Sequence, residues 1–207
     1  PVVFLDGPSN VYDISALGDV VLFEGYNSTK TITEHLLQQG LTKIGFIGDT
    51  SYCKTIADRY AGYLDALRIN GKQPEEPLVI TKHVENRYYQ GEEIVAAIEE
   101  LPYIPEAFVC ANDDIATDVI LHLKKKGIAV PQDVAVTGFD DKDESAILSP
   151  TLTTVHIGNQ RMGRRLVQAL MWRIDNMDLP KEIVTINTEV VFRESSVKNG
   201  IELTNER

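Results

Sequence analysis

Short apolar runs alternate with helical periods through the middle of the chain. Runs of strand length occur at 20–23, 44–47, 78–80, 107–110 and 134–137. Between them, apolar side chains recur at the three- and four-residue spacing of a helix that buries one face. Strands that alternate with helices are joined by right-handed crossovers, and this order gives a parallel sheet covered on both faces. The pattern therefore predicts an α/β fold with a doubly wound parallel sheet.

The first helix expected in this series has an apolar face at Ile32 and Leu36. Asn27 or Ser28 can cap its start and Gly40 can end it. The other expected helices have apolar faces at Ile56, Tyr60, Tyr63 and Leu67, at Gly91, Ile94, Ile98 and Leu101, and at Ile115, Val119 and Leu123.

Both ends of the chain depart from this alternation. Residues 2–5 resemble a strand, and 151–157 look extended although they follow the completed series. A long helix is expected over 160–177, with two further extended segments at 183–186 and 190–192. Its expected apolar face consists of Met162, Leu166, Leu170 and Ile174. Strand 2–5 and helix 160–177 have no obvious sheet of their own, and they predict part of a second α/β lobe.

The expected division follows from this pattern. Residues 21–155 with 183–207 would form a C-terminal effector-binding lobe. Residues 1–20 with 156–182 would form a partial N-terminal lobe, reached by hinge crossovers.

Charge and composition narrow the classes of function. There are 31 acidic and 20 basic residues, a net charge of −11, and such a surface repels phosphate backbones. The chain as given is therefore expected to bind nucleic acid poorly. No apolar run reaches the length of a membrane span, so no membrane contact is expected.

Cysteine and histidine positions offer little chemistry. Cys53 and Cys110 can form a disulfide or remain free thiols, and their distant spacing favours thiols in a reducing compartment. The histidines lack metal-ligand spacing, so neither a metal nor a cofactor is expected. The strand–helix turns carry no GxGxxG or Walker loop, and no Ser/His/Asp arrangement is suggested. We therefore expect a protein that is not an enzyme.

Polar residues directly follow several of the expected strands. Ligands of open parallel sheets bind outside the carboxyl ends of the strands. The residues at these ends are Asp6, Asp49, Asn112 and Asp140, and Arg59 lies in the helix after strand 44–47. Carboxylates, amides and guanidinium groups pair with adjacent hydroxyls, as a sugar ligand requires.

Each of these residues also has a structural alternative. Asn112 can cap the helix that begins near Asp113, and Arg59 can form a surface ion pair. Asp6, Asp49 and Asp140 can be ordinary turn or capping residues.

Several sequence blocks resemble one family. Two blocks are similar to sequence blocks of lactose- and galactose-repressor regulators, in the same order along the chain. They are PEAFVCANDDIA at 105–116 and GIAVPQDVAVTGFDD at 127–141. A further match is residues 41–48, with Leu41-Thr42 where the family has Gly-His or similar residues. The other matches are Arg59 with Gly62, LTTV at 152–155 followed by Met162-Gly163, and RESS at 193–196, which closes the series. The resemblance covers essentially the whole chain.

The resemblance implies a periplasmic-binding-protein-like fold of two lobes, joined by three crossovers, with an effector in the cleft. It implies effector contacts at Asp6, Thr55, Arg59, Asn112 and Asp140. The family often has a stacking aromatic residue where this chain has Asn86, with Tyr88 and Tyr89 nearby.

The resemblance also implies a cytoplasmic, sugar-responsive transcription regulator that forms a homodimer. Its helix-turn-helix head, hinge helix and first strands would precede Pro1, and DNA would be bound only through that head. The alternative is an exported sugar-binding protein of a transport system, which shares the fold.

Overall fold

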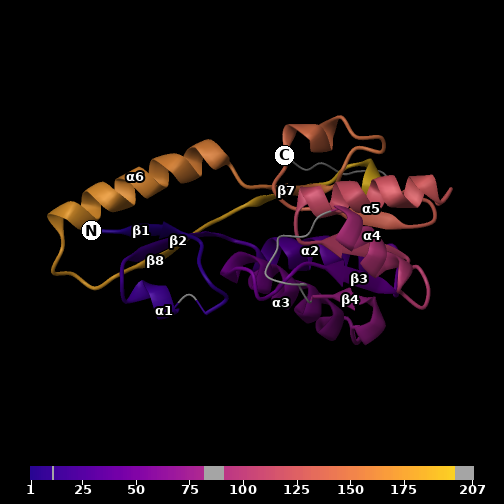
Figure 1. Ribbon diagram of the computed structural model, residues 1–207, viewed down its shortest axis with the longest axis horizontal. Coiled ribbons are helices and arrows are strands. Elements are labelled where there is room, and N and C mark those ends of the chain that lie inside the picture. Colours follow the sequence, from indigo (N-terminus) through magenta and orange to yellow (C-terminus); the bar gives the residue numbers. More distant parts are fainter. Residues whose placement is uncertain (11, 82–90, 199–207) are drawn as a thin grey trace.

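The computed structural model describes residues 1–10, 12–81 and 91–198, which form an elongated molecule of two lobes (Figure 1). The lobes differ in size and in how well their sheets are covered. The aromatic position expected at Asn86, with Tyr88 and Tyr89, and the end of the chain after 198 lie outside the described residues.

The larger lobe contains a four-stranded parallel sheet in the order β4-β3-β5-β6. The strands are Val79–Ile80, Ile44–Ile47, Ala107–Cys110 and Ala135–Thr137, in that order. Helix α2 (Tyr26–Gln38) packs against α3 (Lys54–Ile69), and α4 (Gly91–Glu99) packs against α5 (Asp113–Lys125). Right-handed crossovers place the two helix pairs on opposite faces of the sheet. The predicted doubly wound α/β fold is confirmed.

A large apolar core fills this lobe. Phe46 and Phe108 are fully buried, and the buried Tyr63 donates its hydroxyl to the Ile44 carbonyl over 2.8 Å. Gly45 is required beside them, because a Cβ there would lie 2.8 Å from the Leu78 carbonyl oxygen and 3.2 Å from the Phe108 ring. The strands are apolar on both sides because helices cover both faces.

The smaller lobe contains a three-stranded parallel sheet in the order β1-β2-β8. Its strands are Val3–Leu5, Asp19–Phe23 and Ile183–Ile186, and helix α1 (Tyr12–Ser15) lies between the first two in sequence. This pairing differs from the expected division, which assigned 21–23 and 183–186 to the larger lobe. Strand β2 pairs with β1 on one side and with β8 on the other, so both segments belong to the smaller sheet. Pairing between distant segments cannot be read from local periodicity.

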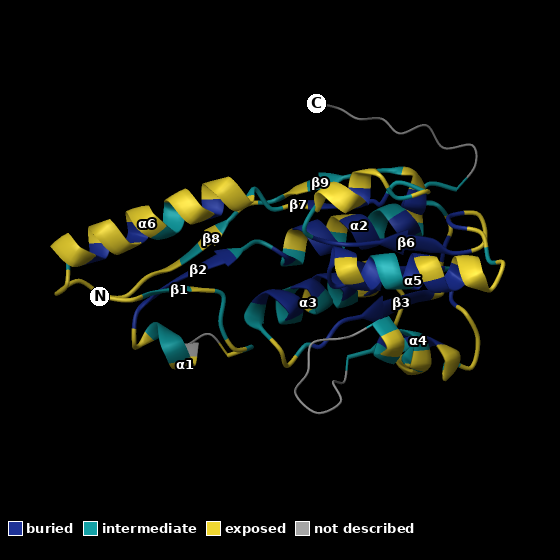
Figure 2. Ribbon diagram, turned by 45° about the horizontal axis from the view of Figure 1, so that its top comes forward, coloured by how far each residue is buried: buried dark blue, intermediate teal, exposed yellow. Residues whose placement is uncertain are grey.

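Helix α6 (Asn159–Asp175) covers one face of the smaller sheet (Figure 2). Its buried residues are Met162, Ala169 and Arg173, with Leu166 partly buried. The expectation that Leu170 and Ile174 share the buried face is wrong, because they are 37% and 49% exposed. The helix carries apolar residues on more than one side, and contact with the sheet decides which side is buried.

Three crossovers connect the lobes: β2 to α2, β7 (Thr154–His156) to α6, and β8 to β9 (Glu189–Val191). Strands β7 and β9 form an antiparallel ribbon between the lobes. The ribbon continues the larger sheet, because Gly138 and Asp140 donate backbone hydrogen bonds to Thr153 and Val155. Short 3-10 helices occupy Glu76–Leu78, Asp143–Ala146 and Glu194–Ser196.

Helix α2 starts earlier than predicted. It begins at Tyr26, and the Glu24 carboxylate accepts hydrogen bonds from the backbone amides of Asn27 and Ser28, the two residues expected as caps. Gly40 ends the helix region as expected, with a φ of 83°.

Three findings concern the described residues alone. Cys53 and Cys110 are both free. The described histidine, cysteine and acidic residues include no group that could hold a metal ion. No described helix is long and apolar enough to cross a membrane.

Candidate functional site

The candidate site lies at the carboxyl edge of the larger sheet. Helix α3 leads from β3 to β4, whereas α5 leads from β5 to β6 on the other side of β3. The chain thus turns in opposite directions after β3 and β5. Ligands of doubly wound folds bind in the crevice expected at such a switch point, and this part of the sheet edge is named the crevice.

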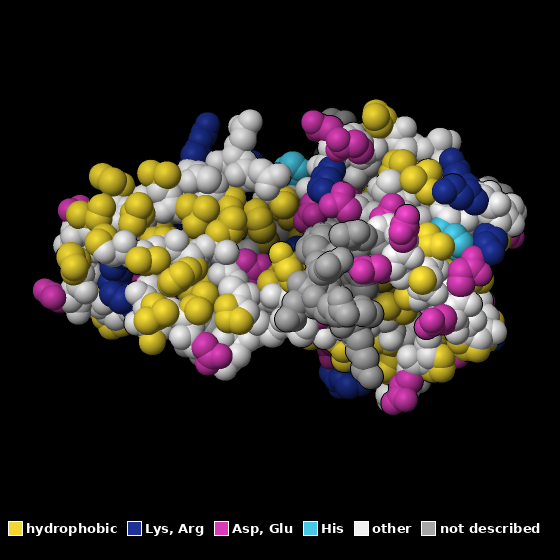
Figure 3. Space-filling view, viewed as in Figure 1, with side chains coloured by type: hydrophobic (Ala, Val, Ile, Leu, Met, Phe, Trp, Pro, Cys, Tyr) yellow, Lys and Arg dark blue, Asp and Glu magenta, His cyan; other side chains and the backbone are white. Residues whose placement is uncertain are grey.

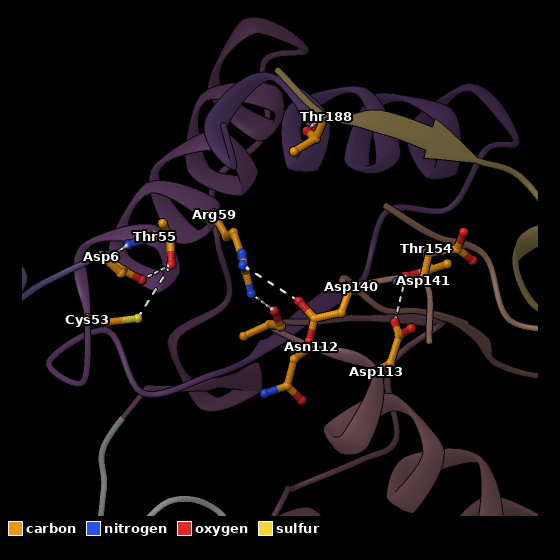
Figure 4. Close-up of polar contacts among 12 residues, drawn as sticks. Asp6, Cys53, Thr55, Arg59, Asn112, Asp113, Asp140, Asp141, Thr154 and Thr188 are labelled. Carbon is orange, nitrogen blue, oxygen red and sulfur yellow. Dashed lines mark hydrogen bonds and ion pairs between the residues drawn. The ribbon is translucent and has the colours of Figure 1, made fainter. Parts of the chain in front are cut away.

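Arg59 crosses this crevice from the second turn of α3 (Figure 4). One guanidinium nitrogen donates to the Ala111 carbonyl oxygen directly after β5. The guanidinium carbon lies 3.6 Å from the centre of the Phe139 ring. Arg59 is 6% exposed, so the alternative of a surface ion pair is wrong.

Asp140 faces Arg59 from the loop after β6. Its Oδ1 lies 3.9 Å from Arg59 Nη2, which is an ion pair but too long for a direct hydrogen bond. The Asp140 side chain keeps 24% of its surface exposed. Burial nevertheless raises the pKa of its carboxyl to about 6, even though the Arg59 charge favours the ionised form.

Asn112 lies at the start of α5, between Ala111 and the helix. It is 2% exposed, and its Oδ1 accepts a hydrogen bond from the Ile115 amide over 2.9 Å. The capping role is therefore confirmed for this oxygen. Toward a ligand at the crevice, Asn112 would act as a donor through its side-chain nitrogen.

Asp6 and Thr55 lie together where the smaller lobe meets the start of α3. The Thr55 hydroxyl donates to Asp6 Oδ2 over 2.5 Å, and the Gly7 amide donates to Asp6 Oδ1 over 2.8 Å. Asp6 has a φ of 58°, the turn conformation that its alternative interpretation predicted. The five expected contact residues thus form two groups, Asp6 with Thr55 and Arg59 with Asn112 and Asp140.

Asp49, the remaining residue at a strand end, has a local role. Its Oδ1 accepts hydrogen bonds from both the amide and the hydroxyl of Ser51. The carboxylate closes the turn after β3, as the structural alternative predicted.

Asp113 is a buried residue of the site that the sequence did not single out as a contact. Its carboxylate accepts hydrogen bonds from the Lys142 amide, the Ser145 hydroxyl and the Thr154 hydroxyl, over 3.0, 2.5 and 2.6 Å. Gly138 is needed beside it, since a Cβ there would lie 2.3 Å from Asp113 Oδ1. The Asn-Asp-Asp run at 112–114 was the available signal, but only the fold reveals that Asp113 holds the loop after β6.

The arrangement provides donors and acceptors at one edge, with a fixed cation and a partly exposed carboxylate. It can bind a small polar molecule through paired hydrogen bonds.

Comparisons with known proteins agree with this fold. The family of periplasmic binding protein-like domains matches residues 33–196. The HTH-type transcriptional repressor PurR of Mannheimia succiniciproducens is 30% identical over 200 residues, which are 96% of this chain and 58% of that protein. The NTD biosynthesis operon regulator NtdR of Bacillus subtilis is 29% identical over 90% of this chain and 56% of its own length.

Solved structures agree as well. A LacI-family regulator from Sanguibacter keddieii has a TM-score of 0.75 and 30% identity, over 86% of this chain and 66% of that one. A complex of the regulator CelR with cellobiose has a TM-score of 0.82 and 26% identity, over 94% of this chain and 58% of that one.

The family match over residues 33–196 and the agreement in fold are stronger evidence of family membership than any single sequence motif. The chain spans less than three fifths of the two curated relatives, 58% and 56% of their lengths. It belongs to the family of periplasmic binding protein-like domains, in the form that serves as the effector-binding domain of LacI-family transcription regulators.

Proposed function

We propose that Arg59, Asn112 and Asp140, together with Asp6 and Thr55, bind a carbohydrate effector. The observation that carries this proposal is the 3.9 Å separation between Arg59 Nη2 and Asp140 Oδ1. A ligand hydroxyl placed between them accepts from the guanidinium and donates to the carboxylate. The Phe139 ring and the Ala111 carbonyl fix the guanidinium in advance, which lowers the entropic cost of binding.

The carbohydrate is favoured by the chemistry of the site and by one similar protein. CelR, whose fold this chain shares, is described in complex with cellobiose. A sugar offers adjacent hydroxyls that both donate and accept, and a site of buried polar groups discriminates against ligands that leave them unpaired.

In the proposed full-length protein, the effector regulates operator binding through a helix-turn-helix head outside this chain. Because this chain has a net charge of −11 and repels phosphates, the contacts with the DNA backbone are made by that head. The effector binds one arrangement of the lobes more tightly than another and so shifts their populations. Paired half-sites require paired heads, so we propose a homodimer that acts in the cytoplasm.

The test is a thermal-shift and calorimetric screen of this chain against monosaccharides, disaccharides including cellobiose, sugar phosphates, and free nucleobases. A compound that binds the folded state at about 100 times its Kd adds about 2.7 kcal/mol of stability. Asp140→Asn should abolish the shift, because the amide replaces the acceptor charge. Asp65→Asn is the matched control, since Asp65 also accepts from several side chains of α2 and α3, away from the crevice.

The outcomes separate the parts of the proposal. If a nucleobase binds and no sugar does, the proposal of a carbohydrate ligand is wrong, whereas the proposal of an effector site still holds. A shift that survives in Asp140→Asn contradicts the site. A monomer in sedimentation at micromolar concentration of the full-length protein contradicts the homodimer.

A further inference from the structure

Two consecutive aspartates after β6 point to different parts of the molecule. Asp140 faces Arg59 at the crevice, 3.9 Å away. Asp141 faces the ribbon between the lobes, where its Oδ2 lies 2.9 Å from His156 Nδ1 and its Oδ1 lies 2.6 Å from Arg193 Nη2. Figure 4 shows Asp140 beside Arg59 and Asp141 beside Thr154. One peptide unit therefore separates the crevice from the hinge.

The two partners of Asp141 come from the two sides of the ribbon between the lobes. His156 is the last residue of β7, from which the chain enters the smaller lobe as α6. Arg193 follows β9, to which the chain returns from β8. Arg193 also donates from Nη1 to the Leu152 carbonyl, 2.9 Å away at the other end of the ribbon. A single carboxylate thus contacts both sides of the ribbon, which carries two of the three crossovers between the lobes.

Charged side chains other than Arg59 also act on Asp140, namely Asp113, Asp114 and Lys142. In the ribbon, the acidic residue Glu189 lies opposite His156 in the β7–β9 register. Asp113 accepts from Thr154, whose hydroxyl in turn accepts from the Asp141 amide over 3.2 Å. The Asp141 carboxylate therefore links the cationic side chains of the ribbon to the loop that carries Asp140.

The backbone of both aspartates is unusual. Asp140 has a φ of 127° and Asp141 a φ of 52°, values that residues with a side chain rarely adopt. Hydrogen bonds hold this conformation, since the Asp140 amide donates to the Val155 carbonyl over 3.0 Å. Such a conformation persists only when its surroundings determine it, and here the surroundings are the hinge strand itself.

We infer that Asp141 is a positioning residue that couples Asp140 to the angle between the lobes. A change in the interactions of Asp140 rotates the 140–141 peptide, and the Asp141 carboxylate then moves β7 and β9 with it. The effector-dependent part of this coupling rests on the proposed function of Asp140. The mechanical link between the two aspartates and the ribbon does not depend on the ligand.

The test is a double-mutant cycle read out as a distance between the lobes. Labels are attached through unnatural amino acids at Leu121 on α5 and Ile174 on α6, both about half exposed. Distance distributions are measured by single-molecule fluorescence transfer for the wild type, Asp140→Asn, Asp141→Asn and the double variant. Asp65→Asn serves as a control that loses a comparable set of ionic contacts away from the hinge.

Asp141→Asn should broaden the inter-lobe distribution, whereas Asp65→Asn should leave it unchanged. Asp140→Asn should shift the mean distance when Asp141 is present and should produce no shift in the Asp141→Asn background. An unchanged distribution in Asp141→Asn, or an equal shift from Asp140→Asn in both backgrounds, overturns the inference. These outcomes are obtained without any ligand, so they are independent of whether the sugar screen succeeds.

A second variant guards against a folding defect. The His156 side chain is 54% exposed, so His156→Ala removes one arm of the contact without opening the core. It should give a smaller broadening than Asp141→Asn, because Arg193 still holds the carboxylate. A distribution identical to that of the wild type contradicts the role of the Asp141–His156 contact. Cellobiose is then added to each variant, and a sugar-induced distance change that persists in Asp141→Asn contradicts the coupling.

Discussion

The two lobes are built from the same kind of parallel sheet, but they bury it to different extents. In the larger lobe, helices cover both faces and a large apolar cluster fills the interior, with a small cluster of Ile32, Phe139 and Val155 beside it. In the smaller lobe the described residues form two small apolar clusters, and many apolar side chains are exposed and gather over this lobe in Figure 3. These include Leu5, Leu17, Val167, Met171, Ile174 and Met177. Exposed apolar area of this kind marks a surface suited to contact with other protein.

The lobes also use buried charge differently. In the smaller lobe Arg173 is 1% exposed and donates to both oxygens of Asp19 and to the carbonyls of Asn176, Leu179 and Pro180. This network ties the end of α6 to the start of β2. In the larger lobe, the buried charges Arg59 and Asp113 lie at the carboxyl edge of the sheet, beside the candidate site. Buried charge supports the architecture in the smaller lobe. In the larger lobe it supports the architecture at Asp49 and Asp113 and the candidate site at Arg59.

The largest effect should follow from opening the core of the larger lobe. Phe108 is fully buried at the centre of its sheet, so Phe108→Ala removes the ring and leaves a cavity. We expect a loss of about 3–5 kcal/mol in the free energy of unfolding. Urea denaturation followed by circular dichroism measures it. A loss below about 1 kcal/mol would mean that the core repacks freely and that the contrast between the lobes is weaker than described.

A more local effect should follow from Arg173→Leu, which leaves the Asp19 carboxylate buried without its cation. Hydrogen exchange should then show reduced protection in β1, β2 and β8 and nearly unchanged protection in β3, β5 and β6. Arg68→Leu is the matched control, because Arg68 also pairs with an aspartate but its side chain is 69% exposed. Equal loss of protection in both sheets after Arg173→Leu would show that the lobes open as one unit.

The smallest effect concerns the pH dependence of the larger lobe. The folded-state pKa of Asp140 is raised from 3.8 to about 6 by burial, so the folded protein binds a proton more tightly than the unfolded chain. Its contribution to stability therefore increases as the pH falls through about 6, and it is lost as the pH rises through that value. Relative to Asp140→Asn, the wild type should gain about 1 kcal/mol between about pH 7.5 and about pH 5.

Urea denaturation of both proteins at the two pH values measures this difference. Parallel pH profiles for the wild type and Asp140→Asn would mean that the Asp140 carboxyl is as well solvated in the folded protein as in the unfolded chain.

The ionised carboxylate is the better acceptor, so effector affinity should decline below about pH 6.

Several features could be predicted from the sequence because they depend on neighbouring residues. The strand–helix alternation between 44 and 137 gave the doubly wound sheet, since burial on both faces leaves a local apolar pattern. The positions of Asn112 and Asp140 at the carboxyl edge followed from the same alternation, because parallel strands end at a common edge. The resemblance to one family pointed to the same residues.

Other features were decided only by the tertiary structure, because they depend on contacts between distant segments. One such feature is the sheet of β1, β2 and β8. The pairing of β2 with β8 joins residues more than 160 positions apart in the sequence, such as Val20 and Ile183. Arg59 is buried because Phe139, from another strand end, covers its guanidinium. Asp141 meets His156 and Arg193 only when the ribbon is formed. Local periodicity determines which side chains of one helix or strand can be buried together. The packing of helices and strands against one another determines which of those side chains are buried in the folded protein.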